Sequence, residues 1–219
     1  MPAPVRDHRP LWVRVASRTA ALFGVRFYNM LYGERTLGDT VRHVEPLPGL
    51  IVRRATPSDL ARLGTVFGPA QAESCRIATA QHSQCFVAVE EEEIAGYSWL
   101  NSHDIYLLSW KIQALPPQGG YTYNSFVCPE FRGRKIFQRL TEAVYSELEQ
   151  EGFQFCCNLV DRDNAPSVAA RKHLGARFHA APILKLPGLN PLPLLRFPFG
   201  FSAGDSPGRK ERDSLNPHG

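Results

Sequence analysis

The first regular pattern in the chain is an apolar stripe that recurs about once per helical turn. Between residues 11 and 32 the apolar side chains fall near one face, and these are Trp12, Ala16, Phe23, Phe27, Met30 and Leu31. The spacing predicts an amphipathic helix over residues 11–32 that stops at Gly33. Arg14, Arg18 and Arg26 interrupt the segment, which argues against a membrane span and against a secretory signal.

A second set of patterns begins at Leu50 and predicts a compact domain. Residues 50–54 are typical of a short strand, and Thr56-Pro57 is typical of a helix start, with Thr56 as the N-cap. Two strands at residues 85–90 and 94–100 flank the acidic run Glu90–Glu93, which predicts a hairpin with a solvated tip. Residues 101–120 show no clear pattern.

The second half of the chain alternates strands with helices. Strands are predicted at residues 121–127, 153–160 and 178–186, and helices at residues 136–151 and 164–174. The helix at 136–151 has the strongest signal, with apolar residues at three- or four-residue spacing, namely Ile136, Leu140, Val144 and Leu148. This order of elements predicts an α/β fold with a mixed sheet.

The 219 residues suffice for one well-buried core, and 43% of them are hydrophobic, as in ordinary globular proteins. We divide the chain into an N-terminal helix with its connector (residues 1–49), a compact domain (residues 50–200) and a polar tail (residues 201–219). The tail is rich in Gly, Pro and mixed charges, so we expect it to be disordered.

Charge and cysteine content narrow the function classes. The net charge is +4, and 20 of the 25 basic residues are Arg, whose guanidinium suits phosphate and carboxylate, although genomic composition bias explains the excess as well. The arginines are spread out and no nucleic-acid reading motif is present, which argues against a nucleic-acid binder. The five Cys form no metal-ligand spacing, so we expect buried, reduced thiols rather than a metal site or a nucleophile.

The most informative stretch runs from residue 125 to residue 140, where a strand enters a short basic loop that opens into a helix. Pro129 ends the strand, and the loop Arg132-Gly133-Arg134-Lys135 precedes the helix. The first N–H groups of a helix have no intrahelical partner, and the helix dipole adds partial positive charge there. A pyrophosphate fits such a site, and Gly133 allows close approach of the backbone.

This stretch resembles the signature of the GNAT superfamily of acyl-CoA N-acyltransferases, in which Arg or Gln is followed by x-x-Gly-x-Gly/Ala after a strand ending in Val-x-Pro-Glu. A later segment is similar to a second motif of the family, and it reads Asn164-Ala165-Pro166-Ser167 followed by Lys172-His173-Leu174-Gly175. The two matches cover about residues 50–186. The resemblance implies a mostly antiparallel central sheet flanked by helices, to which the N-terminal amphipathic helix is an addition.

The resemblance also implies a role for each matching position. The pyrophosphate of CoA would be held by the backbone amides of Arg132, Gly133, Arg134, Lys135, Ile136 and Phe137. The main chain of Phe126 and Val127 would pair with the pantetheine arm, and one of its N–H groups would polarise the thioester carbonyl. Asn164 would hydrogen-bond the pantetheine from the other side, with Ser167 nearby or capping its own helix.

Several positions depart from the family pattern, among them Ala176, which stands where a Phe usually follows the closing Gly. Lys135 and Phe137 stand where glycines are expected. We expect right-handed helical backbone to tolerate Lys135, and the bulk of Phe137 to narrow the approach to the phosphates. Arg171 stands where the family often has the Tyr that protonates the leaving thiolate.

The central strand also lacks the expected Glu base. Tyr121, Tyr123 and Asn124 stand there instead, which makes Tyr121 or Tyr123 a candidate acid, with simple packing as the alternative. His103 and Asp104 fall in the region where acceptors bind, and surface positions are the alternative for both.

We therefore expect an N-acyltransferase that moves an acetyl group from acetyl-CoA to an amine of a small-molecule or sugar-like acceptor, without a metal. The alternatives are a longer acyl chain delivered by acyl carrier protein and a non-catalytic relative that binds CoA or a partner. We expect a cytoplasmic protein. The apolar face of the N-terminal helix needs cover, from its own domain, from a second subunit in a homodimer, or from peripheral contact with a membrane.

Overall fold

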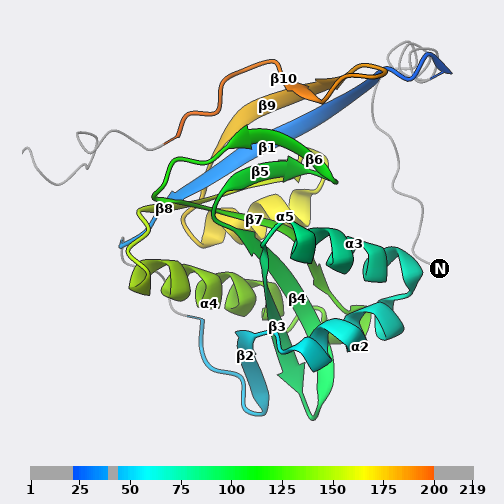
Figure 1. Cartoon of the computed structure of the whole chain (residues 1–219). Coiled ribbons are helices and arrows are strands. Elements are labelled where there is room, and N and C mark those ends of the chain that lie inside the picture. The colour runs from blue at the N-terminus through cyan, green and yellow to red at the C-terminus, as the bar shows by residue number, and fades with distance from the viewer. Residues whose placement is uncertain (1–21, 39–43, 200–219) are drawn as a thin grey trace, which may run out of the picture.

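The computed structural model describes residues 22–38 and 44–199, which contain a sheet of eight strands in the order β10-β9-β1-β8-β7-β4-β3-β2 (Figure 1). The strands of this sheet are β1 (Arg26–Thr36), β2 (Leu50–Arg54), β3 (Gln84–Glu90), β4 (Glu93–Asn101), β7 (Gly119–Val127), β8 (Phe155–Asp161), β9 (Arg177–Lys185) and β10 (Leu192–Pro193). Neighbouring strands are antiparallel except β7 and β8, which run parallel. The predicted α/β fold with a mixed, mostly antiparallel sheet is confirmed.

Both faces of the sheet are covered. Helices α4 (Ile136–Gln150) and α5 (Ala165–His173) lie on one face. The other face carries helices α2 (Pro57–Phe67) and α3 (Pro69–Ala80) and the small hairpin of β5 (Asp104–Leu107) and β6 (Trp110–Ala114). Strand β3 contributes to both cores, because Phe86 packs toward α4 while Val87 packs toward α2 and α3.

The helix predicted over residues 11–32 is wrong in its second half, because residues 26–36 form β1. This strand lies inside the sheet and pairs with β8 on one edge and with β9 on the other. Tyr28, Met30 and Tyr32 pack into one core at every second position, while Phe27 is exposed. Aromatic residues fit a pleated strand well. The hydrogen bonds to β8 and to β9 favour the strand over the helix that the apolar spacing predicted. Residues 11–21 of the predicted helix and the tail 201–219 lie outside the described residues.

Gly33, predicted to end a helix, instead allows close packing in the middle of β1. A Cβ at this position would lie 2.6 Å from the Phe178 ring and 2.9 Å from the amide of Asn158. These distances are too short for real contacts, so only glycine fits here without a shift of both neighbours. Residues 26–36 therefore belong to the same sheet as residues 50–193.

The other predicted elements lie close to where the patterns placed them. The acidic tip between β3 and β4 is a two-residue turn in which Glu91 and Glu92 both have positive φ, at 47° and 69°. The unassigned stretch 101–120 contains the β5–β6 hairpin and the start of β7. Short strands such as these give too few alternating positions to be recognised. Across the described ranges, no helix has the length and apolar character needed to cross a membrane.

The predicted start of α2 is confirmed in atomic detail. The Thr56 hydroxyl accepts a hydrogen bond from the Asp59 amide at 3.2 Å, and the Thr56 amide donates to the Asp59 carboxylate at 2.7 Å. This reciprocal pair is a capping box. Arg53 donates to the same carboxylate at 2.5 Å, and this bond is the main reason that the pKa of Asp59 falls to about 2.

Asp59→Asn is expected to lower the free energy of unfolding by about 1–2 kcal/mol near neutral pH, because it removes the charged cap and the partner of Arg53. The folded pKa of about 2 lies below the ordinary value of 3.8. The stabilisation is therefore present above about pH 4 and is lost as the pH falls toward 2. Urea denaturation of both proteins across this range measures it. Glu73→Gln is the control, because its pair with Arg76 is exposed, and a gap that persists unchanged in acid would contradict the prediction.

Candidate active site

The site is built where the one parallel pair of strands in the described sheet separates. Strands β7 and β8 are paired from Gly119–Phe155 to Thr122–Asn158, and no pair follows. Beyond Thr122, β7 stays with β4 through a bulge, and Asn124 takes a positive φ of 45°. The separation opens a cleft of about 190 Å³, lined by Tyr123, Asn124, Ser125, Phe137, Leu159, Val160, Asp161, Asn164, Ser167 and Arg171. We refer to it as the β7–β8 cleft.

The basic turn next to this cleft leads from a 3₁₀ turn (Pro129–Phe131) into α4. Gly133 has a φ of 81°, and a Cβ there would meet no atom within 4 Å, so its surface is open. Ile136 and Phe137 lie in the first turn of α4, where amides have no carbonyl one turn back. The Arg132 amide differs, because it donates to the Pro129 carbonyl at 3.2 Å. It is therefore not free for a phosphate.

The side chains of the turn are less available than the sequence indicates. Arg134 donates two hydrogen bonds to Glu90 at 2.5 and 2.6 Å, which lowers the pKa of that carboxyl. Arg132 donates through Nε to the Val127 carbonyl at 3.3 Å. The positive character of the turn thus comes from the backbone and from exposed Lys135 more than from Arg134.

The expectation that Lys135 adopts right-handed helical backbone is wrong. Lys135 is the N-cap of α4 and has φ 58° and ψ 25°, which is the left-handed region. Glycine is the residue that adopts this conformation without a penalty, which explains why a glycine is expected there. Phe137, the second departure, lines the β7–β8 cleft with its ring 5.0 Å from the Arg171 guanidinium.

On the opposite wall of the cleft, Asn164 caps α5. Its side-chain oxygen accepts a hydrogen bond from the Ser167 amide at 3.2 Å, while both residues line the cleft. One face of the Asn164 amide is therefore used by the helix, and its NH₂ group remains a donor. The two predicted residues therefore lie together at the start of α5, on the wall of the cleft opposite β7.

The two candidate acids have different surroundings. Tyr121 is 2% exposed and donates its hydroxyl to the Tyr106 carbonyl at 2.5 Å, and burial raises its pKa well above the ordinary value. The hydroxyl proton of Tyr121 is therefore held by the Tyr106 carbonyl and does not point to a ligand. Tyr123 lines the cleft, and its hydroxyl lies 2.8 Å from the Ser83 hydroxyl. Burial raises its pKa to about 12, so it stays protonated at neutral pH.

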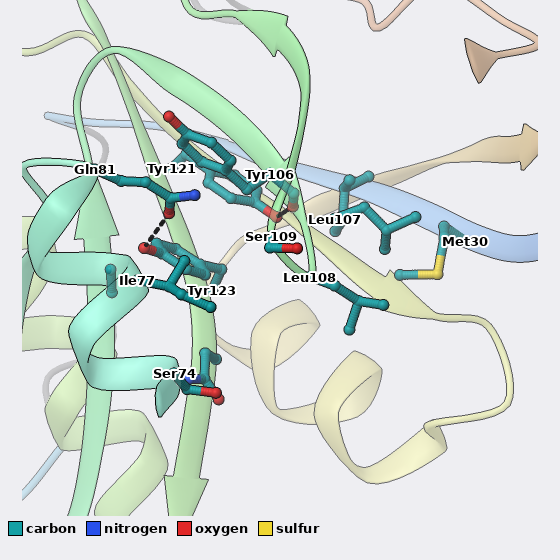
Figure 2. Close-up of a pocket in the computed structure, with 13 residues that line it drawn as sticks. Met30, Ser74, Ile77, Gln81, Tyr106, Leu107, Leu108, Ser109, Tyr121 and Tyr123 are labelled. Carbon is teal, nitrogen blue, oxygen red and sulfur yellow. Dashed lines mark hydrogen bonds between the residues drawn. The ribbon is translucent and has the colours of Figure 1, made fainter. Parts of the chain in front are cut away.

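A larger cavity of about 370 Å³ lies on the other face of β7 (Figure 2). Its lining comes from β1, α3, the β5–β6 turn, β7 and β8, and consists of Met30, Ser74, Ile77, Ala78, Gln81, Tyr106, Leu107, Leu108, Ser109, Tyr121, Tyr123, Asn124 and Leu159. None of these side chains carries a charge at neutral pH. Three of them also line the β7–β8 cleft, namely Tyr123, Asn124 and Leu159.

The remaining predicted residues lie elsewhere. Neither His103 nor Asp104 lines the cavity, and Asp104 pairs with Lys111 at 2.6 Å. The five Cys are buried, and burial raises the pKa of Cys128 to about 11 and that of Cys156 to about 12, which disfavours a nucleophilic role. Within the described ranges, no group of three or more His, Cys, Asp or Glu side chains is arranged to hold a metal ion.

The geometry agrees with a sequence comparison. The model of the acetyltransferase (GNAT) family matches residues 58–176, which is more than half of the chain. The chain belongs to this family. A comparison with curated protein sequences finds no match.

Solved GNAT structures show the same fold at low identity. The chain is similar to a GCN5-related N-acetyltransferase from Sphaerobacter thermophilus, with 18% identity, a TM-score of 0.53, and coverage of 80% of this chain and 58% of that one. It is also similar to a tandem GNAT protein from the clavulanic acid biosynthesis pathway, with 16% identity, a TM-score of 0.50, and coverage of 84% and 61%. The chain spans less than two thirds of the length of either structure.

Arg171 is the site residue whose importance the sequence did not indicate. It appeared only as a replacement for Tyr, yet in this GNAT fold it is 5% exposed and lines the β7–β8 cleft. Its Nη1 donates to the Thr122 hydroxyl at 3.2 Å. A basic residue in the last turn of a helix usually caps carbonyls or faces solvent, so the sequence alone offered no signal that this side chain turns inward.

Lys135→Gly is expected to raise the free energy of unfolding by about 0.5–1 kcal/mol. The substitution removes the steric cost of a Cβ on left-handed backbone and leaves the turn intact. Lys135→Ala is the matched control, since it removes the same charge and keeps the Cβ. Equilibrium denaturation compares the three proteins. Equal stability of the Gly and Ala variants would contradict the strain assigned to this position.

Proposed function

We propose that the chain is an acyl-CoA-dependent N-acyltransferase whose acceptor is a small molecule with a single amine and an otherwise uncharged, largely apolar or aromatic body. The observation that carries the proposal is the meeting of two cavities at Tyr123, Asn124 and Leu159. One is the β7–β8 cleft, which Phe137 in the first turn of α4 helps to line, and the other has an uncharged lining with three tyrosines. A donor in the first and an acceptor in the second would meet at the wall that the cavities share.

The donor side offers the groups that an acyl-CoA needs. The edge of β7 that faces away from β4 pairs with no described strand from Tyr123 to Val127, and only the Val127 carbonyl is engaged there, by Arg132 Nε. An extended pantetheine can therefore pair with this main chain as an added strand would. Asn164 faces it from α5. The open surface of Gly133 and the first turn of α4 suit the pyrophosphate.

The reaction then needs positioning more than acid–base groups. The amine nitrogen attacks the thioester carbonyl, the C–N bond forms, the C–S bond breaks, and the nitrogen loses a proton to solvent. No carboxylate lines the described acceptor cavity, so the neutral fraction of the amine is the attacking species. Holding the two reactants together in adjoining cavities supplies the rate gain expected from proximity.

CoA at a saturating concentration is expected to raise the melting temperature of the protein, because it binds only the folded state. Gly133→Glu is expected to abolish that shift, because a carboxylate would project into the open surface where the phosphates bind. Gly49→Glu is a closely matched control, since Gly49 has φ 82° and equally open surroundings away from the site. Calorimetry measures CoA affinity in all three proteins. If Gly133→Glu binds CoA as tightly as the control does, the turn is not the phosphate site.

The lining of the larger cavity predicts which amines react. With acetyl-CoA as donor, phenylethylamine is expected to give a higher kcat/KM than kanamycin, because a polycation entering an uncharged cavity loses its hydration without gaining an ion pair. Ser74→Glu places a carboxylate on the α3 wall and is expected to shift the preference toward the polycation by about tenfold.

Ala80→Glu adds the same charge on α3 outside the cavity and is the control for this shift. A preference for kanamycin in the unmodified protein would reject the acceptor class. CoA binding without turnover of any amine would favour instead the reading of the chain as a non-catalytic CoA-binding relative.

A further inference from the structure

Arg171 lies at the closed end of the β7–β8 cleft. Thr122 and Asn158 form the last pair before the two strands separate, and the guanidinium reaches Thr122 from α5. The ring of Phe137 covers the guanidinium at 5.0 Å. Any chain that enters the cleft along β7 therefore ends at this cation.

The guanidinium has too few protein partners for its burial. It carries five N–H donors, and its hydrogen bonds in the described structure amount to the single contact with Thr122. Its Nε is buried without a partner. No described Asp or Glu forms a salt bridge with it, whereas Arg53, Arg54, Arg76 and Arg134 each have at least one.

This arrangement is unfavourable in the free protein. A buried cation without a counterion loses its hydration and receives no ion-pair energy in return. Burial lowers the pKa of Arg171, yet the ordinary value is so high that the group stays charged near neutral pH. An anion that reaches the end of the cleft would satisfy both the charge and the free N–H groups.

We propose that Arg171 binds the thiolate that CoA becomes when the acyl group leaves. The inference rests on the proposed function, since pantetheine lying along β7 toward Thr122 carries its sulfur at the advancing end. When the C–S bond breaks, the electron pair moves to sulfur while the acceptor nitrogen keeps the acyl carbon and releases its proton to solvent. The guanidinium stabilises the new negative charge and transfers no proton.

Ionisation of the thiol of bound CoA can be distinguished from ionisation of the protein groups near the guanidinium. Those that face it or line the cleft are Tyr121 and Tyr123 on β7, Cys156, Cys157 and Asp161 on β8, and Tyr145 on α4. Burial raises the pKa of each of the tyrosines and cysteines in this set, to about 12 for Tyr123 and Cys156. A thiol that ionises between about pH 6 and 9 therefore belongs to the bound CoA.

The test uses the full chain with CoA and with desulfo-CoA, which lacks the sulfur. Ultraviolet absorbance of the thiolate is expected to show that the thiol of bound CoA titrates at least about one pH unit below that of free CoA. Calorimetry near pH 9 is expected to give CoA an affinity at least about tenfold higher than desulfo-CoA. Arg171→Gln is expected to remove both differences, and Arg171→Lys to keep part of each.

Desulfo-CoA also reports on folding, because its affinity should be nearly equal in all three proteins. If Arg171→Gln fails to bind desulfo-CoA, the variant is not informative, and the titration of the CoA thiol bound to the unmodified protein decides whether the proposal holds. An unshifted thiol with equal affinities overturns the role of Arg171 and leaves the proposed function standing. A guanidinium that instead selects succinyl-CoA over acetyl-CoA, with no thiol shift, also overturns it. Failure of the unmodified protein to bind either compound overturns the proposed function itself.

Discussion

The separation of β7 from β8 beyond Thr122 and Asn158 is the constraint on which the rest of the site depends. A parallel pair in the middle of a sheet would ordinarily continue and bury its backbone. Here β8 is held on its other edge by β1, and β7 is held by β4 through a bulge at Asn124, so the two strands follow different neighbours. The freed edge of β7 needs hydrogen-bond partners, and a ligand or water must supply them.

The same separation explains the position of β1 in the fold. Strand β1, near the beginning of the described chain, pairs with the edge of β8 that β7 does not use. On its other edge, β1 pairs with β9. Close packing against Phe178 and Asn158 requires a glycine at position 33. Strand β1 is thus part of the sheet that positions the cleft, and its removal would expose the edge of β8.

Much of this fold could be predicted from sequence, because long elements such as α4 and capped starts such as that of α2 repeat a pattern over several turns. Residues 26–36 were predicted wrongly because their apolar spacing fits one face of a helix as well as alternate positions of a strand. Only the long-range pairs with β8 and β9 decide between the two structures. The inward turn of Arg171 escaped for a related reason, because its partners Thr122 and Phe137 are distant in sequence and a local pattern does not record them. The left-handed backbone of Lys135 did have a local signal, namely the glycine expected at this position, and the assumption of right-handed backbone passed over it.

The arginine-rich composition takes on a different meaning once each guanidinium is located. Arg53, Arg54 and Arg134 are neutralised by carboxylates on other elements and serve the fold. Arg171 differs because its side chain is far more buried than theirs, yet no carboxylate among the described residues pairs with it. Burial without a partner lowers the stability of the free protein, and in our proposal the thiolate of CoA supplies the missing anion. If the cleft holds the pantetheine chain as we propose, the complex supplies the interaction that Arg171 does not make in the free protein, and the stability lost on folding becomes affinity for the bound thiolate.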